Sequence, residues 1–270
     1  MRKGVPVLND VQNNHRHPEA PRERGASGWP TKKAPMPTIL ITGANKGLGL
    51  GFAQRYAADG WRVLAACRTP EAATDLTPLA QTQDVQIHAL DVTDHGSIDA
   101  LATTIAEPID ILLNNAAVQG AHPQKFGHTD YAAWELAFHT NVMGVMKMCE
   151  AFAGHVERGD KKLIVNVSSR TSSIAGKTKA DPDNYKGELH QYRSTKSALN
   201  MVSRCMAWEL QPRGIAVVML GPGWVRTDLG GPKARLSVDE AIAACVPTIN
   251  ALTLADTGQF RGHDGSTVPW

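Results

Sequence analysis

From Thr38 onward, short apolar runs alternate with longer segments in which apolar residues recur every three or four positions. The short runs have the length of strands and are apolar throughout, which is typical of strands buried on both faces. The predicted strands are residues 38–43, 61–68, 85–92, 109–117, 161–169, 214–223 and 258–262. The helical spacing predicts helices at residues 48–60, 96–106, 131–156, 192–211 and 237–252.

Strands that alternate with helices indicate an α/β fold whose sheet is parallel and covered on both faces. Right-handed crossovers then give a Rossmann-type doubly wound parallel sheet of about seven strands flanked by helices, in a single domain. Ligands bind such sheets at the carboxyl ends of the strands, near the point where the strand order reverses. The binding and catalytic residues are therefore expected at those strand ends.

Residues 1–37 differ in kind from the rest of the chain. They are rich in Pro and charged residues, and they lack the apolar central region of a secretory signal. A segment with so little apolar surface to bury cannot offset its ordering entropy, so we expect a disordered tail. The predicted domains are thus the tail, residues 1–37, and one Rossmann-type α/β domain, residues 38–270.

Composition excludes several classes of function. Hydrophobic residues make up 42% of the 270 residues, and the formal net charge is only +2, with the cations scattered. We therefore expect neither nucleic acid nor a membrane as a partner, and the absence of an apolar run of about 18 residues predicts no transmembrane helix. The four cysteines have neither zinc nor disulfide spacing, which favours reduced thiols in a cytoplasmic protein.

A glycine-rich turn, "TGANKGLG" at residues 42–49, follows the first predicted strand and opens the first helix. Gly43, Gly47 and Gly49 let the backbone turn sharply and approach a pyrophosphate without a Cβ clash. The amino terminus of the helix then offers free N–H groups to that anion. The turn predicts a nicotinamide dinucleotide site, with Asn45 and Leu48 between the glycines.

The end of the second predicted strand indicates which dinucleotide binds. An NAD site usually has an acidic residue there for the ribose 2′-hydroxyl, whereas this chain has Cys67 followed by Arg68. With Lys46 in the glycine turn, two cations and no carboxylate favour a 2′-phosphate and hence NADP(H). The alternative is that Arg68 only faces solvent. Asp91, after the third strand, is placed to accept a hydrogen bond from adenine, to cap the next turn, or both.

Seven motifs in register resemble the short-chain dehydrogenase/reductase family. They span about residues 38–270 and are "TGANKGLG", "LDV", "NNAA", Asn141, "IVNVSS", "YRSTK" and "GPGWVRTDLGG". The ending "GQFRGHDGSTVPW" is similar to the C-factor and sniffer-like carbonyl reductase branch. The resemblance implies a catalytic set of Asn141, Ser169, Tyr192 and Lys196, and it implies homo-oligomers formed through the two long helices.

Tyr192 and Lys196 are four positions apart, so on a helix they share a face. A nearby ammonium favours the phenolate and lowers the pKa of a tyrosine from its ordinary value near 10. Tyr192 is therefore expected to act as the general acid in carbonyl reduction and as the base in alcohol oxidation. By resemblance, Lys196 also binds the nicotinamide ribose, and Asn141 supports a helix irregularity with a water in the proton relay.

The serine that would polarise the substrate oxygen is less defined by sequence. The family pattern places it second in Asn-x-Ser-Ser, which is Ser169, with Ser168 and Ser172 as alternatives. The separation between Ser169 and Tyr192 is longer than is common in the family. This polar insertion is expected either to border the substrate cleft or to make no substrate contact.

The remaining cofactor contacts follow from the resemblance. They comprise Val92 after the third strand, the "NNAA" residues and the loop that follows the sixth strand. The predicted set is Gly43, Asn45, Lys46, Gly47, Leu48, Gly49, Arg68, Asp91, Val92, Asn115, Ala116, Ala117, Tyr192, Lys196, Pro222, Gly223, Val225 and Thr227. Trp224 is placed to wall the substrate pocket or to fill core, with the core favoured. No metal is expected, because neither His139 nor His190 has a second ligand at metal spacing.

These features predict an NADP(H)-dependent oxidoreductase that moves a hydride between nicotinamide and a carbonyl or secondary alcohol. The alternative is a protein of the same fold that binds NADP(H) and signals, with little turnover. The four catalytic residues favour the enzyme, because a sensor needs no activated tyrosine.

Overall fold

The structure, a computed structural model, describes Met1, residues 36–178 and residues 188–270. Met36–Trp270 form one compact unit. Most of the predicted tail therefore lies outside the described residues, as does the middle of the predicted insertion. Within the described part, no helix is both long enough and apolar enough to cross a membrane.

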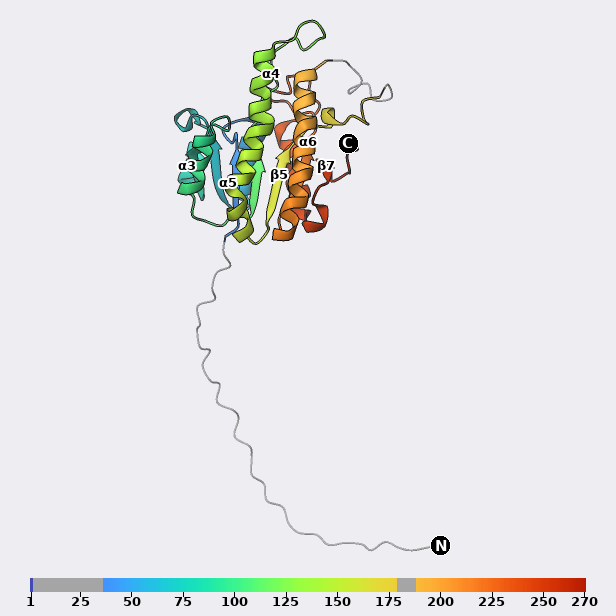
Figure 1. Ribbon diagram of the computed structural model, residues 1–270. Helices are drawn as coiled ribbons and strands as arrows, with labels where there is room; N and C mark the ends of the chain where they lie inside the picture. The colour runs from blue at the N-terminus through green and yellow to red at the C-terminus, as the bar shows by residue number, and fades with distance from the viewer. Residues whose placement is uncertain (2–35, 179–187) are drawn as a thin grey trace. The chain divides into compact units, whose positions relative to one another are not determined.

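Seven parallel strands form one sheet in the order β3-β2-β1-β4-β5-β6-β7 (Figure 1). They are β1 Thr38–Thr42, β2 Arg62–Cys67, β3 Val85–Ala89, β4 Ile111–Asn114, β5 Leu163–Val167, β6 Ala216–Gly221 and β7 Phe260–Gly262. The predicted doubly wound parallel sheet is confirmed, including the short last strand. The order reverses between β1 and β4, which pair through Leu40 and Leu112.

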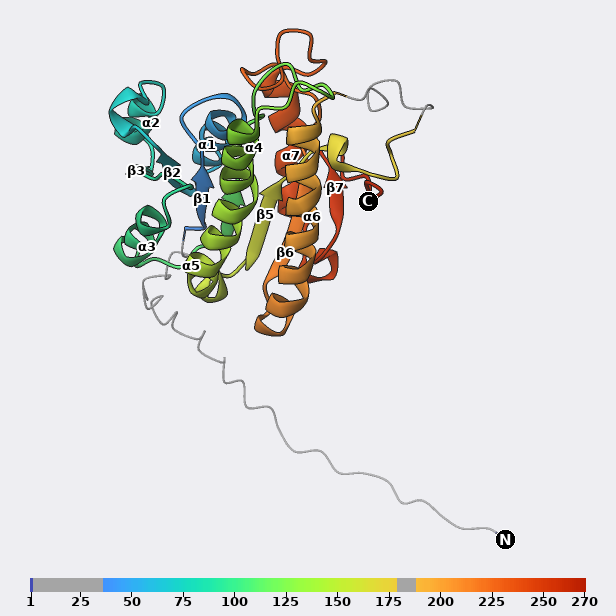
Figure 2. The ribbon, with the colours of Figure 1, turned by 45° about the horizontal axis from the view of Figure 1, so that its top comes forward.

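The α-helices are α1 Gly47–Ala58, α2 Thr77–Thr82, α3 His95–Thr104, α4 Tyr131–Phe138, α5 Gly144–Arg158, α6 His190–Leu210 and α7 Val238–Ala251. Short 3-10 turns lie at Pro70–Ala72, Arg170–Ser172, Gln211–Arg213 and Leu254–Asp256. Helix α3, helix α5 and helix α6 cover one face of the sheet, and α1 and α7 cover the other (Figure 2). The sheet is thus the middle of three layers.

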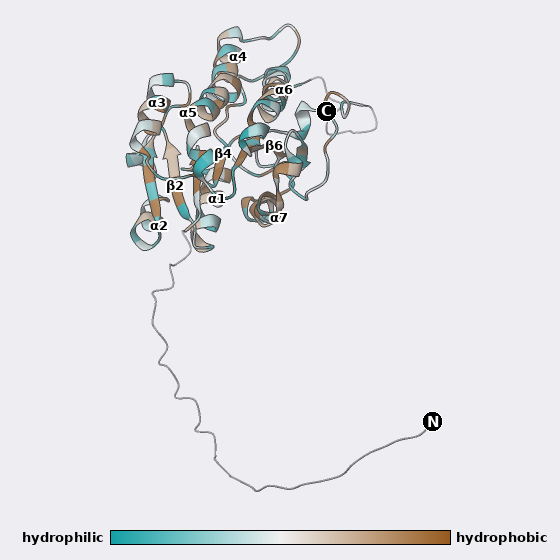
Figure 3. Ribbon diagram, turned by 60° about the horizontal axis from the view of Figure 1, so that its bottom comes forward, coloured by the Kyte–Doolittle hydropathy of each residue, from teal (hydrophilic) through white to brown (hydrophobic). Residues whose placement is uncertain are grey.

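The strands contribute side chains to the hydrophobic cores on both faces of the sheet, because successive side chains of a strand point to opposite faces. Ile39 and Ile41 of β1 pack into the core beneath α1 and α7, whereas Leu40 between them packs into the core beneath α3 and α5. The inner strands accordingly carry mostly apolar residues along their length (Figure 3). The edge strand β3, with the sequence VQIHA, instead alternates apolar and polar residues and is only partly buried. Burial on both faces thus explains the continuous apolar pattern of the inner strands.

The predicted long helix at residues 131–156 is interrupted. A π-helical turn, His139–Met143, separates α4 from α5, and the fully buried Asn141 lies within it. Helix α2 has no counterpart among the predicted helices, because its six residues are too few to show a helical period. Cys67, Cys149 and Cys245 are buried and Cys205 is exposed, and all four thiols are free.

Candidate active site

A cavity of about 1590 Å³ lies at the carboxyl ends of the strands. A typical pocket for one small ligand occupies roughly 300–1,000 Å³, so this cavity has room for a large ligand or for two. It is lined by every sequence-predicted site residue except Gly49 and Asn141. Those two residues lie behind the wall of the cavity, where their contacts shape it.

Two glycines of the turn between β1 and α1 adopt a backbone conformation that disfavours other residues. Gly43 has φ 65° and Gly47 has φ 55°. Gly49 is required for a different reason: a Cβ there would lie 2.1 Å from the carbonyl oxygen of Gly43. The turn can fold this tightly only because Gly49 has no side chain, and it brings the amino terminus of α1 to the cavity.

Asn115, directly after β4, ties that strand end to the glycine turn. Its Nδ2 donates to the carbonyl oxygens of Thr42 (2.9 Å) and Gly43 (3.2 Å). In return, the hydroxyl oxygen of Thr42 accepts from the backbone N–H groups of Asn115 and Ala116, each at 3.0 Å. Thr42 was missed as a site residue. Its only signal in sequence is its place at the end of the first strand.

The two predicted phosphate-binding cations differ in their surroundings. Arg68 is exposed at the end of β2 and lines the cavity. Lys46 is not free: its Nζ lies 2.6 Å from Oδ2 of Asp228, in the loop after β6. No local pattern in the chain indicates this partner, which is 182 positions away.

Asp91 lines the cavity and also caps its own turn. Its Oδ1 accepts from the backbone N–H of Thr93 (2.9 Å) and from the Thr93 hydroxyl (2.7 Å). Burial raises the pKa of Asp91, but these hydrogen bonds and the charge of Arg68 outweigh it and leave the pKa lowered. The capping role is therefore present, and the carboxylate stays charged beside the cavity.

Tyr192 and Lys196 lie one turn apart on α6 and are both buried. The Lys196 ammonium lies 5.9 Å from the centroid of the Tyr192 ring and donates to the carbonyl oxygen of Val167 at 2.7 Å. Burial raises the pKa of Tyr192 to about 12, and this effect is larger than the lowering of the pKa by the nearby Ser169 hydroxyl. Burial also lowers the pKa of Lys196 to about 7.

These directions differ from the sequence-based expectation that Lys196 lowers the pKa of Tyr192. The reason is that the phenol and the amine are both withdrawn from water. Desolvation disfavours the charged form of each group, so it opposes the phenolate and the ammonium alike. In the chain by itself, Tyr192 is held in its protonated form.

The three candidate serines make different contacts. The Ser169 hydroxyl lies close enough to Tyr192 to lower the pKa of the phenol, and it lies 2.8 Å from the Thr171 hydroxyl. The hydroxyl of Ser168 instead donates to Oδ1 of Asn200 at 2.6 Å. Ser172 donates to the carbonyl oxygen of Ser169 at 2.6 Å and is buried. Of the three, Ser169 is the one whose hydroxyl meets Tyr192.

Asn141 braces the cavity wall from the π-helical turn. Its Oδ1 accepts from the backbone N–H of Val118 (2.9 Å), and its Nδ2 donates to the Val118 carbonyl oxygen (2.8 Å). The same Nδ2 donates to the Thr195 hydroxyl at 3.0 Å on α6, between Tyr192 and Lys196. One amide thus ties the strand end after β4 to the helix that carries Tyr192.

One expectation about the substrate side needs correction. Trp224 does not fill core: it is 46% exposed, lines the cavity and donates from Nε1 to the Gly230 carbonyl oxygen at 2.8 Å. His190 packs edge-on against Trp134 and lies 3.4 Å from the Thr129 hydroxyl, so its ring is occupied on that side of α6.

Two further results concern the rim. Residues 179–187 of the predicted insertion lie outside the described residues, but Glu188 and Leu189, which follow them, line the cavity. His263, after β7, also lines it, and its Nδ1 is buried without a hydrogen-bond partner in the described part of the chain. His263 was missed: it lies within the ending "GQFRGHDGSTVPW", but the resemblance carried by that segment assigned it no role.

The family model for short chain dehydrogenases matches residues 37–235. Among curated proteins, C-signal of Myxococcus xanthus is 35% identical over 172 residues, covering 63% of this chain and 99% of that protein. Human L-xylulose reductase is 34% identical over 243 residues, covering 86% of this chain and 93% of the relative.

Solved structures agree with this assignment. NADPH-bound carbonyl reductase from chicken fatty liver superposes with a TM-score of 0.78 at 31% identity, covering 87% of this chain and 99% of the other. Carbonyl reductase Sniffer of Drosophila melanogaster gives 0.78 at 28% identity, covering 87% and 100%. Because the family model matches most of the chain, and the fold and strand-end motifs agree with it, this protein belongs to the short-chain dehydrogenase family.

Proposed function

We propose that this protein is an NADP(H)-dependent oxidoreductase that transfers a hydride between nicotinamide and a carbonyl or secondary alcohol. The observation that carries the proposal is the placement of Ser169, Tyr192 and Lys196 on the wall of one cavity, with Ser169 close enough to Tyr192 to lower its pKa and Lys196 one turn further along α6. A hydroxyl pair beside a buried lysine, at the end of a cavity large enough for two ligands, suits proton transfer to a carbonyl oxygen.

The cofactor proposal is supported by the shape of the glycine turn. Gly49 has no side chain and packs closely against Gly43, so no Cβ covers the backbone N–H groups at the amino terminus of α1, where a pyrophosphate would lie. Lys46 and Arg68 border the cavity and supply positive charge for a 2′-phosphate. Both carbonyl reductases from chicken fatty liver and from Pseudomonas aeruginosa have been solved with such a cofactor, NADPH or NADP.

The remaining predicted cofactor residues line the cavity in two groups. Asn115, Ala116 and Ala117 follow β4, and Pro222, Gly223, Val225 and Thr227 follow β6. The first group would border the cofactor, and the second would hold the carboxamide and phosphates. The bound cofactor would supply the hydride. The residues of this chain would bind the cofactor, orient the substrate and protonate its carbonyl oxygen.

In the reductive direction, Tyr192 would donate its proton to the carbonyl oxygen while Ser169 donates a hydrogen bond to the same oxygen. The raised pKa of Tyr192 suits this role, because the phenol is fully protonated near neutral pH. In the oxidative direction, Tyr192 would accept the alcohol proton. The positive charge of the oxidised nicotinamide would then help to lower its pKa.

Lys196 would bind the ribose hydroxyls of the nicotinamide half, at the distance from Tyr192 that one helical turn sets. Its lowered pKa of about 7 allows it to pass a proton as well as to hold one. Asn141 would act indirectly: its hydrogen bonds hold Val118 at the cavity wall and Thr195, the neighbour of Lys196 on α6.

A second candidate function is signalling with little turnover, and the similarity to C-signal favours it. The two functions differ in what they require of Tyr192. A binding protein needs the cavity but not a proton donor beside Ser169.

The decisive variant is Tyr192→Phe. Removing the hydroxyl should leave NADPH binding intact, as followed by cofactor fluorescence, and should lower carbonyl reduction by about 10²- to 10⁴-fold. Tyr131→Phe, on the exposed start of α4, is the matched control and should retain full activity. Undiminished turnover in Tyr192→Phe would refute the mechanism, and absence of turnover in the unmodified protein across a carbonyl panel would favour signalling.

A further inference from the structure

The segment that follows β7 doubles back along that strand. Val268 donates from its backbone N–H to the carbonyl oxygen of Phe260 at 2.8 Å, and Thr267 forms an antiparallel bridge with Arg261. The segment is therefore paired to the edge of the sheet. It continues to Trp270, which is far along the chain from the glycine turn at residues 42–49.

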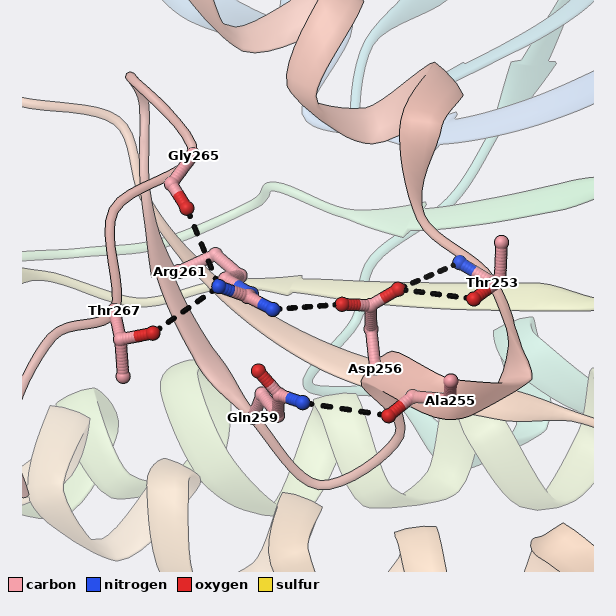
Figure 4. Close-up of polar contacts among 7 residues, drawn as sticks. All are labelled: Thr253, Ala255, Asp256, Gln259, Arg261, Gly265 and Thr267. Carbon is pink, nitrogen blue, oxygen red and sulfur yellow. Dashed lines mark hydrogen bonds and ion pairs between the residues drawn. The ribbon is translucent and has the colours of Figure 1, made fainter.

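Arg261 anchors this segment (Figure 4). Its Nη1 donates to the Thr267 hydroxyl (3.1 Å) and to the Gly265 carbonyl oxygen (3.3 Å), and its Nη2 lies 2.8 Å from Oδ1 of Asp256. Asp256 in turn accepts from the backbone N–H of Thr253 at 2.9 Å. The guanidinium and carboxylate are only about one fifth exposed, so this is a partly buried network rather than a surface pair.

Trp270 is held from two sides. Its ring lies 5.8 Å from the Phe260 ring of β7, and the guanidinium carbon of Arg204 on α6 lies 5.0 Å from its centroid. These contacts fix the backbone of Trp270 as well as its side chain. An aromatic ring against an arginine contributes a cation–π attraction of roughly 0.5–2 kcal/mol.

The carbonyl oxygen of Trp270 meets the turn that follows Ser169. It accepts from the backbone N–H of Ala175 at 2.6 Å and from the Ser173 hydroxyl at 3.3 Å. That same hydroxyl oxygen accepts from the backbone N–H of Gly176 at 2.8 Å. Trp270 thus contacts Ser173 and Ala175 directly, and Gly176 through the Ser173 hydroxyl.

Hydrogen bonds continue from that contact to Ser169. Ser173 donates from its backbone N–H to the Arg170 carbonyl oxygen at 3.1 Å. Ser172 donates to the Ser169 carbonyl oxygen twice, from its backbone N–H (2.9 Å) and from its hydroxyl (2.6 Å). A displacement at Ala175 would therefore be transmitted to the residue that meets Tyr192.

Helix α6 holds the opposite side of the turn. The Ser197 hydroxyl donates to the Ser172 carbonyl oxygen at 2.7 Å, and Asn200 donates from Nδ2 to the Ser172 hydroxyl at 2.8 Å. The turn is clamped between the helix that carries Tyr192 and the segment that ends in Trp270. Because Ser169 and Tyr192 are 23 positions apart (192 − 169), the connection between them is too long to fix their relative position by itself.

We propose that Trp270 is a positioning residue: it holds the turn at residues 170–176 so that the Ser169 hydroxyl faces Tyr192. The proposal rests on the proposed function of Ser169 and Tyr192. It assigns a role in the site to a residue that does not line the active-site cavity.

The kinetic test compares Trp270→Ala with Trp270→Phe, which keeps an aromatic ring against Arg204. Trp270→Ala should lower kcat about tenfold, with NADPH affinity unchanged, because small displacements of reacting groups are costly. Trp270→Phe should restore most of the loss. The control is Trp208→Ala, which removes an indole 6.0 Å from the same Arg204 but not the Trp270–Ala175 contact.

Two readouts separate positioning from a general loss of structure. If Trp270 acts through Ser169, adding Trp270→Ala to Ser169→Ala should cause no further loss of kcat. The nearby Ser169 hydroxyl lowers the pKa of Tyr192, so Trp270→Ala should also move the rise of alcohol oxidation with pH to higher pH. Losses that multiply in the double variant, or a Trp270→Ala enzyme with wild-type kcat, would overturn the proposal.

Amide hydrogen exchange separates failure of this proposal from failure of the proposed function. In Trp270→Ala, the amides of Ser173, Ala175 and Gly176 should exchange faster, while those of β1 and α1 keep their rates. Unchanged exchange at the turn would overturn the proposal whether or not the protein turns over a carbonyl. Faster exchange in a protein that reduces no carbonyl would instead refute the proposed function.

Discussion

Lys46 and Asp228 form an ion pair across the mouth of the cavity, with Nζ 2.6 Å from Oδ2. Lys46 caps the amino terminus of α1, and Asp228 belongs to the loop after β6. The two loops also approach each other beside this pair, since a Cβ on Gly47 would lie 3.3 Å from the Thr227 methyl group. Lys46, the cation that we assign to the 2′-phosphate, is therefore already paired with a carboxylate.

Asp228→Asn should consequently tighten NADPH binding. The neutral amide releases Lys46 for the phosphate, and because the pair is exposed, the gain should be modest, up to about fivefold. NADH, which has no 2′-phosphate, serves as the control ligand and should bind with unchanged affinity. Weaker NADPH binding in a cofactor-fluorescence titration would contradict the competition between Asp228 and the phosphate.

Arg68→Asp should move cofactor preference toward NADH. Arg68 is exposed at the end of β2, where a carboxylate would accept from a ribose 2′-hydroxyl and repel a 2′-phosphate. NADPH affinity should fall at least about tenfold, because like charges at short range are strongly disfavoured. The ratio of kcat/KM for the two cofactors measures the change, and an unaltered ratio would show that Arg68 only faces solvent.

Asn141→Ala should destabilise the protein and lower its activity. The substitution leaves the partly buried backbone N–H and carbonyl of Val118 without their partner, at a cost of up to about 1–3 kcal/mol for each group. Thr195→Val removes only the hydroxyl that accepts from Asn141, so it should cost less. Urea unfolding ranks the two variants, and equal losses would mean that the contacts to Val118 contribute little.

The free energy of unfolding of the cofactor-free protein should increase from pH 7 to pH 9. Burial lowers the pKa of Lys196 to about 7 from its ordinary 10.5, so in this window the unfolded chain binds a proton that the folded chain has released. Stability then rises with pH, by about 2 kcal/mol. Above pH 10 the raised pKa of Tyr192 acts in the opposite sense, because only the unfolded chain gains the phenolate charge.

Lys196→Met is the comparison for this pH dependence. A side chain that does not titrate should abolish the rise between pH 7 and pH 9 while the fold is retained. Urea unfolding of both proteins at the two pH values checks the prediction. A rise of the same size in Lys196→Met would assign it to other groups.

Most of the fold could be predicted from the chain because strand and helix periods are local properties. Continuous apolar runs specified the seven strands, and each motif was visible as a short segment at a strand end. Helix α2 was not predicted, because its six residues are too few to show a helical period. The π-helical turn at Asn141 does not arise from spacing, and only the family resemblance suggested an irregularity there.

The candidate site was predicted in outline for the same reason. All but two of the predicted residues line one cavity, since the carboxyl ends of parallel strands meet at one edge of the sheet. Trp224 was misjudged because an indole beside glycines can be buried or exposed, and the choice depends on the packing of residues distant in sequence.

The sequence by itself determined which elements form, in which order, and which chemical groups stand at the strand ends. The tertiary structure alone decided which of those groups touch. It placed Ser169, rather than Ser168 or Ser172, beside Tyr192, paired Lys46 with Asp228, and brought Trp270 against Ala175. It also set the direction of the Tyr192 and Lys196 pKa shifts. Contact and burial depend on distances in space between residues far apart along the chain, and residue spacing does not encode those distances.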